Sequence, residues 1–373
     1  YQELSGEWIM AYTAIDDPSA YFQVKTYAGT DASPQAFTLD GNSDLQPDWV
    51  WIKNRGYANK HVLFDSVRGV NKSLTSSSTA AEVDQNSDGG YLSAFNSDGF
   101  TLTEGSGSDN DTNDDRYNYV AWNWKAGTSF TNDASSTSVG DLDSAGSVNT
   151  DAGFSIITFT GTGSSGPVVA HGLGSVPKMM IFKNIGASSA WTTYHHSVIT
   201  ASGSNKSYLT LNTVDGKRTN GTDTTFLAVN TATFTLGTDE GLNKSSNNYI
   251  AYCFAEKQGY SKFGIYTGNV NADGNFVYLG FKPAFVLVKL YGQSGTWWMW
   301  DNKRNTANPI TQGLSPDTNN AESAPYTAAM DFLSNGFKIR EAGSDINRAS
   351  GLIYMAFAEQ PFVTSTGVPA TAR

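Results

Sequence analysis

Cysteine, histidine and charged side chains are scarce in this chain of 373 residues, and each scarcity narrows the interpretation. The one cysteine, Cys253, cannot form an intrachain disulfide, and its apolar surroundings predict a small buried side chain. Only four histidines are present, and we find no nucleophile elbow, zinc-binding helix motif or phosphate-binding glycine loop. No apolar run is long enough to cross a membrane. We therefore expect neither an enzyme with a recognisable motif nor membrane insertion.

The charge balance is acidic, with a net charge of −11 and a pI of about 4.8. A protein that binds nucleic acid needs a basic face to neutralise the phosphates, so we expect no nucleic-acid partner. An excess of one sign keeps a surface protein soluble through self-repulsion.

Glycine, serine, threonine, asparagine and aromatic residues fill the places that charged residues leave. Aromatic and β-branched residues favour strands, whereas glycine and small polar residues favour turns. No segment longer than about two helical turns shows an apolar period of 3.6 residues. We therefore predict an all-β protein with very little helix.

One pattern occurs three times along the chain. It consists of a proline, an apolar run and a lysine six positions after the proline, at residues 47–53, 177–183 and 283–289. A polar residue lies twelve positions beyond each lysine, as Asp65, His195 and Asp301. A Tyr-x-Ala-aromatic motif follows at nearly constant distance, at residues 119–122, 249–252 and 354–357. A register kept over such distances indicates tandem copies of one domain.

Each copy has several short strands separated by turn signals, which is typical of an antiparallel β-sandwich. We predict three tandem antiparallel β-sandwich repeat domains of similar fold, at residues 21–127, 151–257 and 258–360. The segment between the first two, residues 128–150, is rich in Ser, Thr, Asp and Gly and predicts a linker. Residues 1–20 predict an N-terminal arm, either a docking arm or the end of a longer N-terminal part. Residues 361–373 predict a C-terminal tail without an evident strand partner.

The repeated polar position is the first candidate for chemistry. Asp65 and Asp301 are each followed three positions later by an arginine, whereas His195 is followed there by a valine. A polar position that is repeated, with its partner replaced once, favours a structural ion pair at a strand end over a catalytic acid. The alternative is a carboxylate pair that cleaves glycosidic bonds, because space rather than sequence spacing brings such a pair together.

Calcium is the second candidate. Asp84, Asn86 and Asp88 form the D-x-N-x-D-G opening of an oxygen-ligand loop, and these three residues are the predicted metal ligands. The acidic residue expected at position twelve is replaced by Phe95, so the loop is not an EF-hand. A second acidic cluster covers residues 109–115. The alternative interpretation is that both segments are solvated acidic loops without an ion.

The aromatic residues are the third candidate. Side chains alternate along a strand, so the run Trp297-Trp298-Met-Trp300 cannot point all its indoles to one face. We predict that Trp298 and Trp300 contact a ligand or an interface, because exposed aromatic rings stack on sugars and anchor interfaces. The alternative is burial of both faces, one in the core and one against a neighbouring domain.

The repeated motifs carry a resemblance to a known class of protein. The relevant segments are residues 47–55 (PDWVWIKNR), 64–69 (FDSVRG), 119–126 (YVAWNWKA), 171–184 (HGLGSVPKMMIFKN) and 191–195 (WTTYH). They resemble a repeat domain of tailed-bacteriophage virion proteins, found in tail fibres of marine and cyanobacterial phages. The resemblance covers nearly all of residues 21–373 and supplies no catalytic residues.

The resemblance implies a phage virion structural protein, of the tail-fibre or receptor-binding type, that mediates adhesion to host cells. It implies a homotrimer, other virion tail proteins as partners, and host surface glycan or outer-membrane protein as the receptor. Location in the phage tail, and outside the cell when acting, follows from this. The first alternative is a capsid-decoration or other virion scaffold protein, and the second is a tail-associated polysaccharide depolymerase. No cofactor is expected other than calcium.

Overall fold

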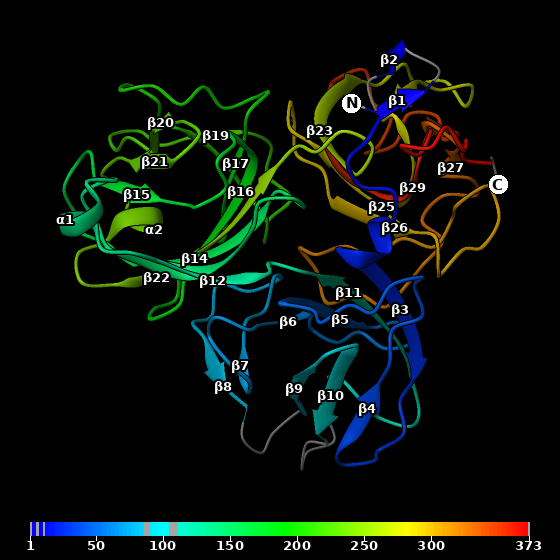
Figure 1. Ribbon diagram of the computed structural model, residues 1–373, viewed down its shortest axis with the longest axis horizontal. Coiled ribbons are helices and arrows are strands. Elements are labelled where there is room, and N and C mark those ends of the chain that lie inside the picture. The colour runs from blue at the N-terminus through cyan, green and yellow to red at the C-terminus, as the bar shows by residue number, and fades with distance from the viewer. Residues whose placement is uncertain (1, 5–6, 10–11, 86–89, 104–110, 372–373) are drawn as a thin grey trace.

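The computed structural model describes residues 2–4, 7–9, 12–85, 90–103 and 111–371. Nearly all regular structure is β-strand, arranged in antiparallel sheets, so the prediction of an all-β fold is confirmed. The strands form three lobes that meet at the middle of the molecule (Figure 1). We call these lobes sandwich 1 (β3–β11), sandwich 2 (β12–β22) and sandwich 3 (β23–β29). Among the described residues, no helix is long and apolar enough to span a membrane.

The N-terminal residues precede sandwich 1 but contact sandwich 3. Two strands, β1 (Gln2–Leu4) and β2 (Glu7–Ile9), pair with each other, and a short 3-10 turn, η1 (Pro18–Ala20), follows. The Asp17 side chain caps η1 by accepting a hydrogen bond from the Ser19 N–H. Downstream of β2, Thr13 donates to the Gln258 carbonyl oxygen. Residues 12–15 therefore lie along the start of sandwich 3.

Sandwich 1 has a four-stranded sheet in the order β3-β11-β5-β6 and a three-stranded sheet in the order β4-β10-β9. The larger sheet consists of β3 (Phe22–Ala28), β11 (Asn118–Trp124), β5 (Trp49–Asn54) and β6 (Val62–Asp65). The smaller sheet consists of β4 (Gln35–Phe37), β10 (Gly99–Thr103) and β9 (Tyr91–Asn96). A separate ribbon pairs β7 (Lys72–Ser73) with β8 (Val83–Asp84).

Sandwich 2 has the largest sheet, eight strands in the order β12-β13-β14-β22-β16-β17-β18-β19. They are β12 (Thr128–Asn132), β13 (Ser144–Asn149), β14 (Phe154–Thr160), β22 (Asn248–Ala255), β16 (Pro177–Asn184), β17 (Thr192–His195), β18 (Ser207–Thr210) and β19 (Arg218–Thr219). The facing sheet has the order β15-β21-β20, with β15 (Val168–Ala170), β21 (Thr233–Leu236) and β20 (Phe226–Val229). Two single-turn helices complete it, α1 (Ala134–Thr137) and α2 (Glu240–Asn243).

Sandwich 3 repeats the arrangement of sandwich 1. Its larger sheet has the order β23-β29-β25-β26, and its smaller sheet the order β24-β28-β27. The larger sheet consists of β23 (Ser261–Thr267), β29 (Gly351–Pro361), β25 (Phe281–Leu290) and β26 (Trp297–Asp301). The smaller one consists of β24 (Phe276–Tyr278), β28 (Gly336–Ile339) and β27 (Met330–Leu333).

The register of the three larger sheets corrects one sequence expectation. The repeated lysines pair across the sheet with Val120, Ile250 and Ile353. The equivalent of Trp122 and Tyr252 is therefore Met355, and the motif expected at residues 354–357 is two residues out of register. Tyr354 instead lies opposite Gly264, where a Cβ would come within 2.6 Å of the tyrosine hydroxyl oxygen. The missing side chain makes room for the ring, and counting along the sequence could not reveal this exchange.

The predicted linker at residues 128–150 is wrong. Its two ends are the strands β12 and β13, which form a hairpin with α1 at its turn. Strand β13 pairs with β14 along six residue positions, so the hairpin extends the large sheet of sandwich 2. The polar composition that suggested a linker reflects strands with one face open to solvent, since Ser129 and Thr131 are exposed. The C-terminal tail folds back on itself, because Val363 and Pro369 form an antiparallel bridge, and its Ser365 N–H donates to Asp16 Oδ1 at 2.6 Å.

The central strands of the three larger sheets are buried on both faces. One face covers the interior of its own sandwich, and the other faces the middle of the molecule, where the three sheets share one hydrophobic core. An aromatic pair joins each two sandwiches in this shared core: Trp49 and Tyr252 at 4.4 Å, Phe22 and Phe357 at 5.2 Å, and Phe254 and Phe357 at 6.0 Å between ring centroids. The proline-led strands carry large apolar side chains on both faces because both faces are buried.

Backbone hydrogen bonds repeat the same contact around the ring of sandwiches. In each, an N–H in one sandwich donates to a carbonyl two residues past the repeated lysine of the next. The pairs are Glu82 to Ile185 at 3.1 Å, Lys217 to Tyr291 at 2.7 Å and Glu322 to Arg55 at 2.8 Å. The sandwiches therefore contact one another head to tail in a closed ring, the geometry of a cyclic trimer within one chain.

Candidate functional site

The repeated polar position is structural. Asp65 ends β6 and binds Arg68 at 2.6 Å, and Asp301 ends β26 and binds Arg304 at 2.6 Å. All four side chains are almost fully buried. Isolated buried charges are costly, and a partner at hydrogen-bond distance offsets that cost. The expectation of an ion pair at a strand end is confirmed, and neither carboxylate is available to a substrate.

The three lysines of the repeated motif, Lys53, Lys183 and Lys289, are buried at equivalent positions of the three sandwiches. Burial lowers the pKa of Lys53 to about 7, and those of Lys183 and Lys289 to about 8. Each ammonium donates to backbone carbonyls, and for Lys183 one of these, Thr79 O at 3.0 Å, belongs to the neighbouring sandwich. Lys289 likewise donates to Thr213 O of the neighbouring sandwich at 3.4 Å, whereas Lys53 donates to Asn54 O and Tyr57 O within sandwich 1.

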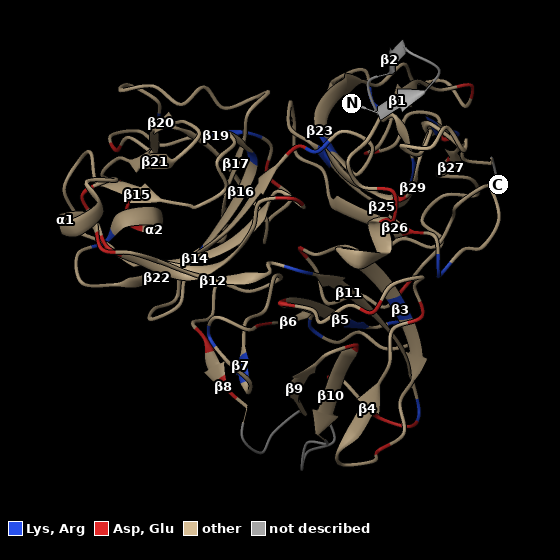
Figure 2. Ribbon diagram, viewed as in Figure 1, with Lys and Arg blue, Asp and Glu red and all other residues tan. Residues whose placement is uncertain are grey.

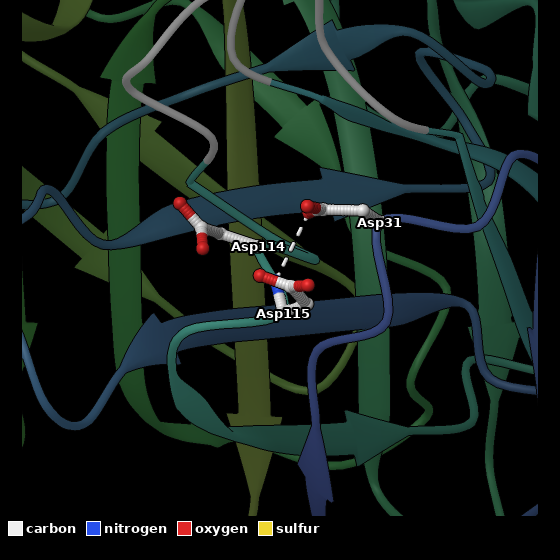
Figure 3. A group of neighbouring side chains, drawn as sticks. All are labelled: Asp31, Asp114 and Asp115. Carbon is white, nitrogen blue, oxygen red and sulfur yellow. Dashed lines mark hydrogen bonds between the residues drawn. The ribbon is translucent and has the colours of Figure 1, made fainter.

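The strongest candidate for a surface site lies at the outer end of sandwich 1. Asp31, Asp114 and Asp115 have carboxylate oxygens within 4.8 Å of one another (Figure 3). The loop geometry brings them together, because the Asp115 N–H donates to Asp31 Oδ1 at 3.0 Å. Asp31 has a left-handed backbone with φ of 52°, which aspartate tolerates. We call these three residues with Tyr57, Tyr117 and Arg116 the acidic rim.

Arginine already neutralises part of the acidic rim. Arg116 Nε lies 2.9 Å from Asp114 Oδ1, and this hydrogen bond lowers the pKa of the Asp114 carboxyl group. Nearby, Asp111 binds Lys60 at 2.7 Å. Asp31, Asp115 and one oxygen of Asp114 could supply three of the six to eight oxygen ligands that calcium takes, with water supplying the others. Asp109, also in the predicted cluster, lies outside the described residues.

An exposed aromatic pair belongs to the acidic rim. Tyr57 and Tyr117 stack with their centroids 5.4 Å apart, and Tyr57 is 52% exposed. The Arg116 guanidinium lies 5.4 Å from the Tyr117 centroid, a cation–π contact that fixes the ring. At the positions equivalent to Tyr57, the other sandwiches carry Ala187 and Gln293.

The predicted contact residues lie elsewhere than expected. Trp300 is fully buried in the interior of sandwich 3, so the prediction that it contacts a ligand or an interface is wrong. Trp298 is partly buried and stacks on Trp300 at 5.8 Å. The indole that meets a neighbouring sandwich is Trp297, whose Nε1 donates to Thr210 O at 3.0 Å. Alternation was predicted correctly, but the pattern alone could not say which face was which.

The predicted calcium loop is described only at its first residue. Asp84 is exposed at the end of β8 and binds Lys72 at 2.7 Å. Asn86 and Asp88 lie outside the described residues. Charged residues elsewhere lie mainly in loops and at strand ends, and the sheets carry few of them (Figure 2).

A shallow groove crosses the sheet face of the β12–β13 hairpin. Two hollows of about 430 and 460 Å³ share Thr131, Ala145 and Thr158 in their walls. Asp48 lines one end, but its carboxylate accepts hydrogen bonds from Ser66 Oγ and from the N–H groups that follow β11. Burial raises the pKa of Asp48, yet both oxygens are engaged. Two further carboxylates line the other end of the groove: Asp143 accepts from the Ala134 N–H, and Asp133 accepts from the hydroxyl groups of Ser135 and Ser136.

Sequence reasoning missed the exposed aromatic residues. Besides Tyr57, three large side chains in one stretch of sandwich 3 are about half exposed, Val270, Phe276 and Tyr278. The sequence does contain a clue, because the other two copies have smaller or more polar residues at the equivalent positions. These equivalent positions could be assigned only from the strand pairing in the structure, because the preceding loops differ in length.

Comparison with known proteins gives one match. A family model described as a domain of unknown function, DUF7483, matches residues 17–361. No curated protein and no solved structure matches the chain. The matched segment contains all three sandwiches, which agrees with a fold whose lobes share one core. The chain belongs to the DUF7483 family.

Proposed function

We propose that this chain is a structural protein of a tailed-bacteriophage virion, of the tail-fibre or receptor-binding type, that attaches the particle to the host surface. Its partners in this role are other tail proteins and a host glycan or outer-membrane protein. It acts outside the cell as part of the phage tail. The resemblance of the repeated motifs to virion repeat domains supports this proposal.

The acidic rim is the observation that carries the proposal. Tyr57 and Tyr117 are stacked and partly exposed at the outer end of a rigid sandwich, although the fold builds the same loops elsewhere with Ala187 and Asn247. Aromatic side chains are large contact surfaces that lose little conformational entropy on binding. The fold does not need these two rings, and exposing apolar surface to water is unfavourable. A contact with a binding partner best explains their presence.

The ring of sandwiches also bears on assembly. A fibre built from three identical chains would place three copies of this ring around one axis, and weak contacts at each rim would add up through multivalency. We therefore retain the homotrimer as part of the proposal. A particle that instead carries single copies on its head would fit the decoration alternative, and immunogold labelling of virions separates head from tail.

A polysaccharide depolymerase needs two carboxylates that face a substrate groove. Three carboxylates line the hairpin groove. Asp48 and Asp143 accept backbone hydrogen bonds, and hydrogen bonds from Ser135 and Ser136 lower the pKa of Asp133, the wrong direction for a general acid. Release of reducing ends from host polysaccharide would establish that alternative.

Adsorption to host cells tests the adhesion proposal. Fluorescently labelled protein should bind host cells and compete with virions for adsorption. A Tyr57→Ala/Tyr117→Ala variant should compete less well, whereas Thr131→Ala, in the hairpin groove, should compete as the parent does. A purified protein that binds no host cells, with or without divalent cations, would exclude the proposal.

A further inference from the structure

A second exposed aromatic pair lies on the edge strand of sandwich 3. Phe276 and Tyr278 occupy alternate positions of β24 and are 46% and 47% exposed, whereas Val277 between them is buried. Alternation along the strand therefore turns both rings to the outer face of the smaller sheet. Strand β24 pairs only with β28 among the described strands, so the rings stand at an open edge.

The other two sandwiches show that the fold does not require these rings. Strand pairing makes Val277 equivalent to Phe37 and Val169. The positions of Phe276 and Tyr278 are then occupied by Ala36 and Thr38 in sandwich 1 and by Val168 and Ala170 in sandwich 2. Smaller side chains occupy these positions in the other two sandwiches, so the strand itself does not require the aromatic pair. The Tyr278 hydroxyl group lies 3.0 Å from the Tyr12 hydroxyl group, whereas the Phe276 ring has no such partner among the described residues.

A lysine without an acidic partner lies beside the aromatic pair. The Lys262 ammonium is 5.1 Å from the Tyr278 ring centroid and donates to Tyr278 O at 3.0 Å. Within the described part of the chain, no carboxylate forms an ion pair with it. The neighbouring cations are paired, Lys338 with Asp273 at 2.6 Å and Arg340 with Asp331 at 2.5 Å. This corner therefore keeps one unbalanced positive charge on a chain of net charge −11.

The loop that leads into β24 is strained at an exposed valine. Val270 has a φ of 57°, in the left-handed region that β-branched residues avoid. The equivalent position is Asp31 in sandwich 1 and Gly163 in sandwich 2, both of which tolerate this conformation. Asn347 fixes the loop, because its Oδ1 accepts from Asn269 N at 2.9 Å. Backbone strain of this kind is found mainly at functional sites, so the exposed Val270 side chain indicates a contact with a binding partner.

We propose that Phe276, Tyr278 and Lys262 form a binding platform for an acidic saccharide of the host surface. The inference rests on the proposed function, since it names the ligand class of a surface-binding protein. The C–H face of a sugar ring carries partial positive charge and stacks on the negative face of an aromatic ring. A carboxylate or sulfate on the sugar pairs with Lys262. Charges farther away than about 8 Å are screened at physiological ionic strength, so the net acidity of the chain does not prevent this contact.

Immobilised oligosaccharides test the platform. A panel pairs four acidic chains (galacturonan, alginate, hyaluronan and chondroitin sulfate) with neutral chains of similar length. We expect at least one acidic chain to be retained in preference to the neutral ones. A Phe276→Ala/Tyr278→Ala variant should lose about tenfold or more in affinity, the effect typical of truncating aromatic anchors. Lys262→Gln should weaken binding of the acidic chain and reduce its salt dependence.

Controls separate this inference from the proposed function. Thr131→Ala, in the hairpin groove, should bind the acidic chain as the parent does. All variants should keep the parent's melting temperature because none of these side chains belongs to a hydrophobic core. Retention of no acidic chain, preference for neutral chains, or unchanged affinity in the double variant would overturn the platform. Host-cell adsorption by a protein that retains no acidic chain would leave the proposed function standing while excluding this inference. Adsorption by no form of the protein would remove the proposed function itself.

Discussion

The Tyr252 hydroxyl group donates a hydrogen bond of 2.7 Å to Asp65 Oδ2, joining sandwich 2 to sandwich 1 inside the shared core. Trp122 makes the equivalent contact from sandwich 1 to sandwich 3, with its Nε1 3.0 Å from Asp301 Oδ2. At the third junction, Met355 stands in place of the donor and His195 in place of the acid. Donor and acceptor are thus replaced together, so this junction buries no unpaired carboxylate.

Removing the Tyr252 hydroxyl group should destabilise the whole ring. In Tyr252→Phe, Asp65 keeps Arg68 but loses one buried hydrogen bond to a charged group, which costs about 1.5–3 kcal/mol of unfolding free energy. Equilibrium unfolding in urea measures this change in unfolding free energy. The matched control is Tyr57→Phe, whose hydroxyl is on a half-exposed side chain and should change the free energy by less than about 0.5 kcal/mol. Equal stability of the two variants would show that the junction contributes little.

The sequence predicted the alternation of side chains along the strands, but it did not predict which strand face contacts another sandwich. The proline-led strands carry bulk on both faces, and this correctly indicated burial on both sides. Which side met another sandwich depended on strand direction, so Trp297 was overlooked and Trp300 was misplaced at the surface. The β12–β13 hairpin was missed because an exposed edge strand has the composition of a loop. The rim carboxylates Asp31 and Asp115 come together only through the fold.

Acid should weaken the protein through its buried histidines. Burial lowers the pKa of His195 to about 3, whereas the unfolded chain has an ordinary value near 6.5. Between these values the unfolded state binds the proton more tightly, so the unfolding free energy falls as the pH drops from about 6.5 towards 3. His171, with a pKa lowered to about 4, acts in the same direction.

The His195→Gln variant measures that contribution. Chemical denaturation at intervals between pH 7 and pH 4 should show a shallower loss of stability in the variant than in the parent. The slope of unfolding free energy against pH should differ between parent and variant by an amount that approaches the uptake of one proton on unfolding. Parallel curves would mean that His195 is protonated in the folded protein, contrary to its burial.

Alkali should strengthen the protein through its buried lysines. The folded pKa of Lys183 is lowered to about 8, and the unfolded value is near 10.5. The unfolded chain therefore holds the proton more tightly between pH 8 and 10.5, and the unfolding free energy rises with pH across that window. Lys183→Met should flatten the rise, and Lys289→Met, at the equivalent position, should flatten it by a similar amount. A fall in the parent's stability between pH 8 and 9.5, with no effect of either variant, would contradict the assignment.

Arg116 should compete with calcium at the acidic rim. It neutralises Asp114, so the parent should gain little melting temperature from millimolar calcium. Arg116→Ala frees the third carboxylate of the cluster, and calcium should then raise the melting temperature by mass action. The double variant Arg116→Ala/Asp115→Asn is the control and should lose that gain. A calcium effect in the parent that survives Asp115→Asn would place the ion elsewhere in the chain.

Relieving strain at Val270 should stabilise the protein while weakening its adhesion. Asparagine tolerates the left-handed backbone that valine occupies there at a cost of about 1–2 kcal/mol, so Val270→Asn should raise the unfolding free energy by roughly 0.5–1 kcal/mol. Ile265→Asn is the matched control, since Ile265 is similarly exposed but lies in an extended strand and has no strain to lose. If the valine is retained for contact with a host ligand, Val270→Asn should also reduce adsorption to host cells. A variant that is more stable and adsorbs equally well would show that the strain has no role in binding, because stability and adhesion would then be separable at this residue.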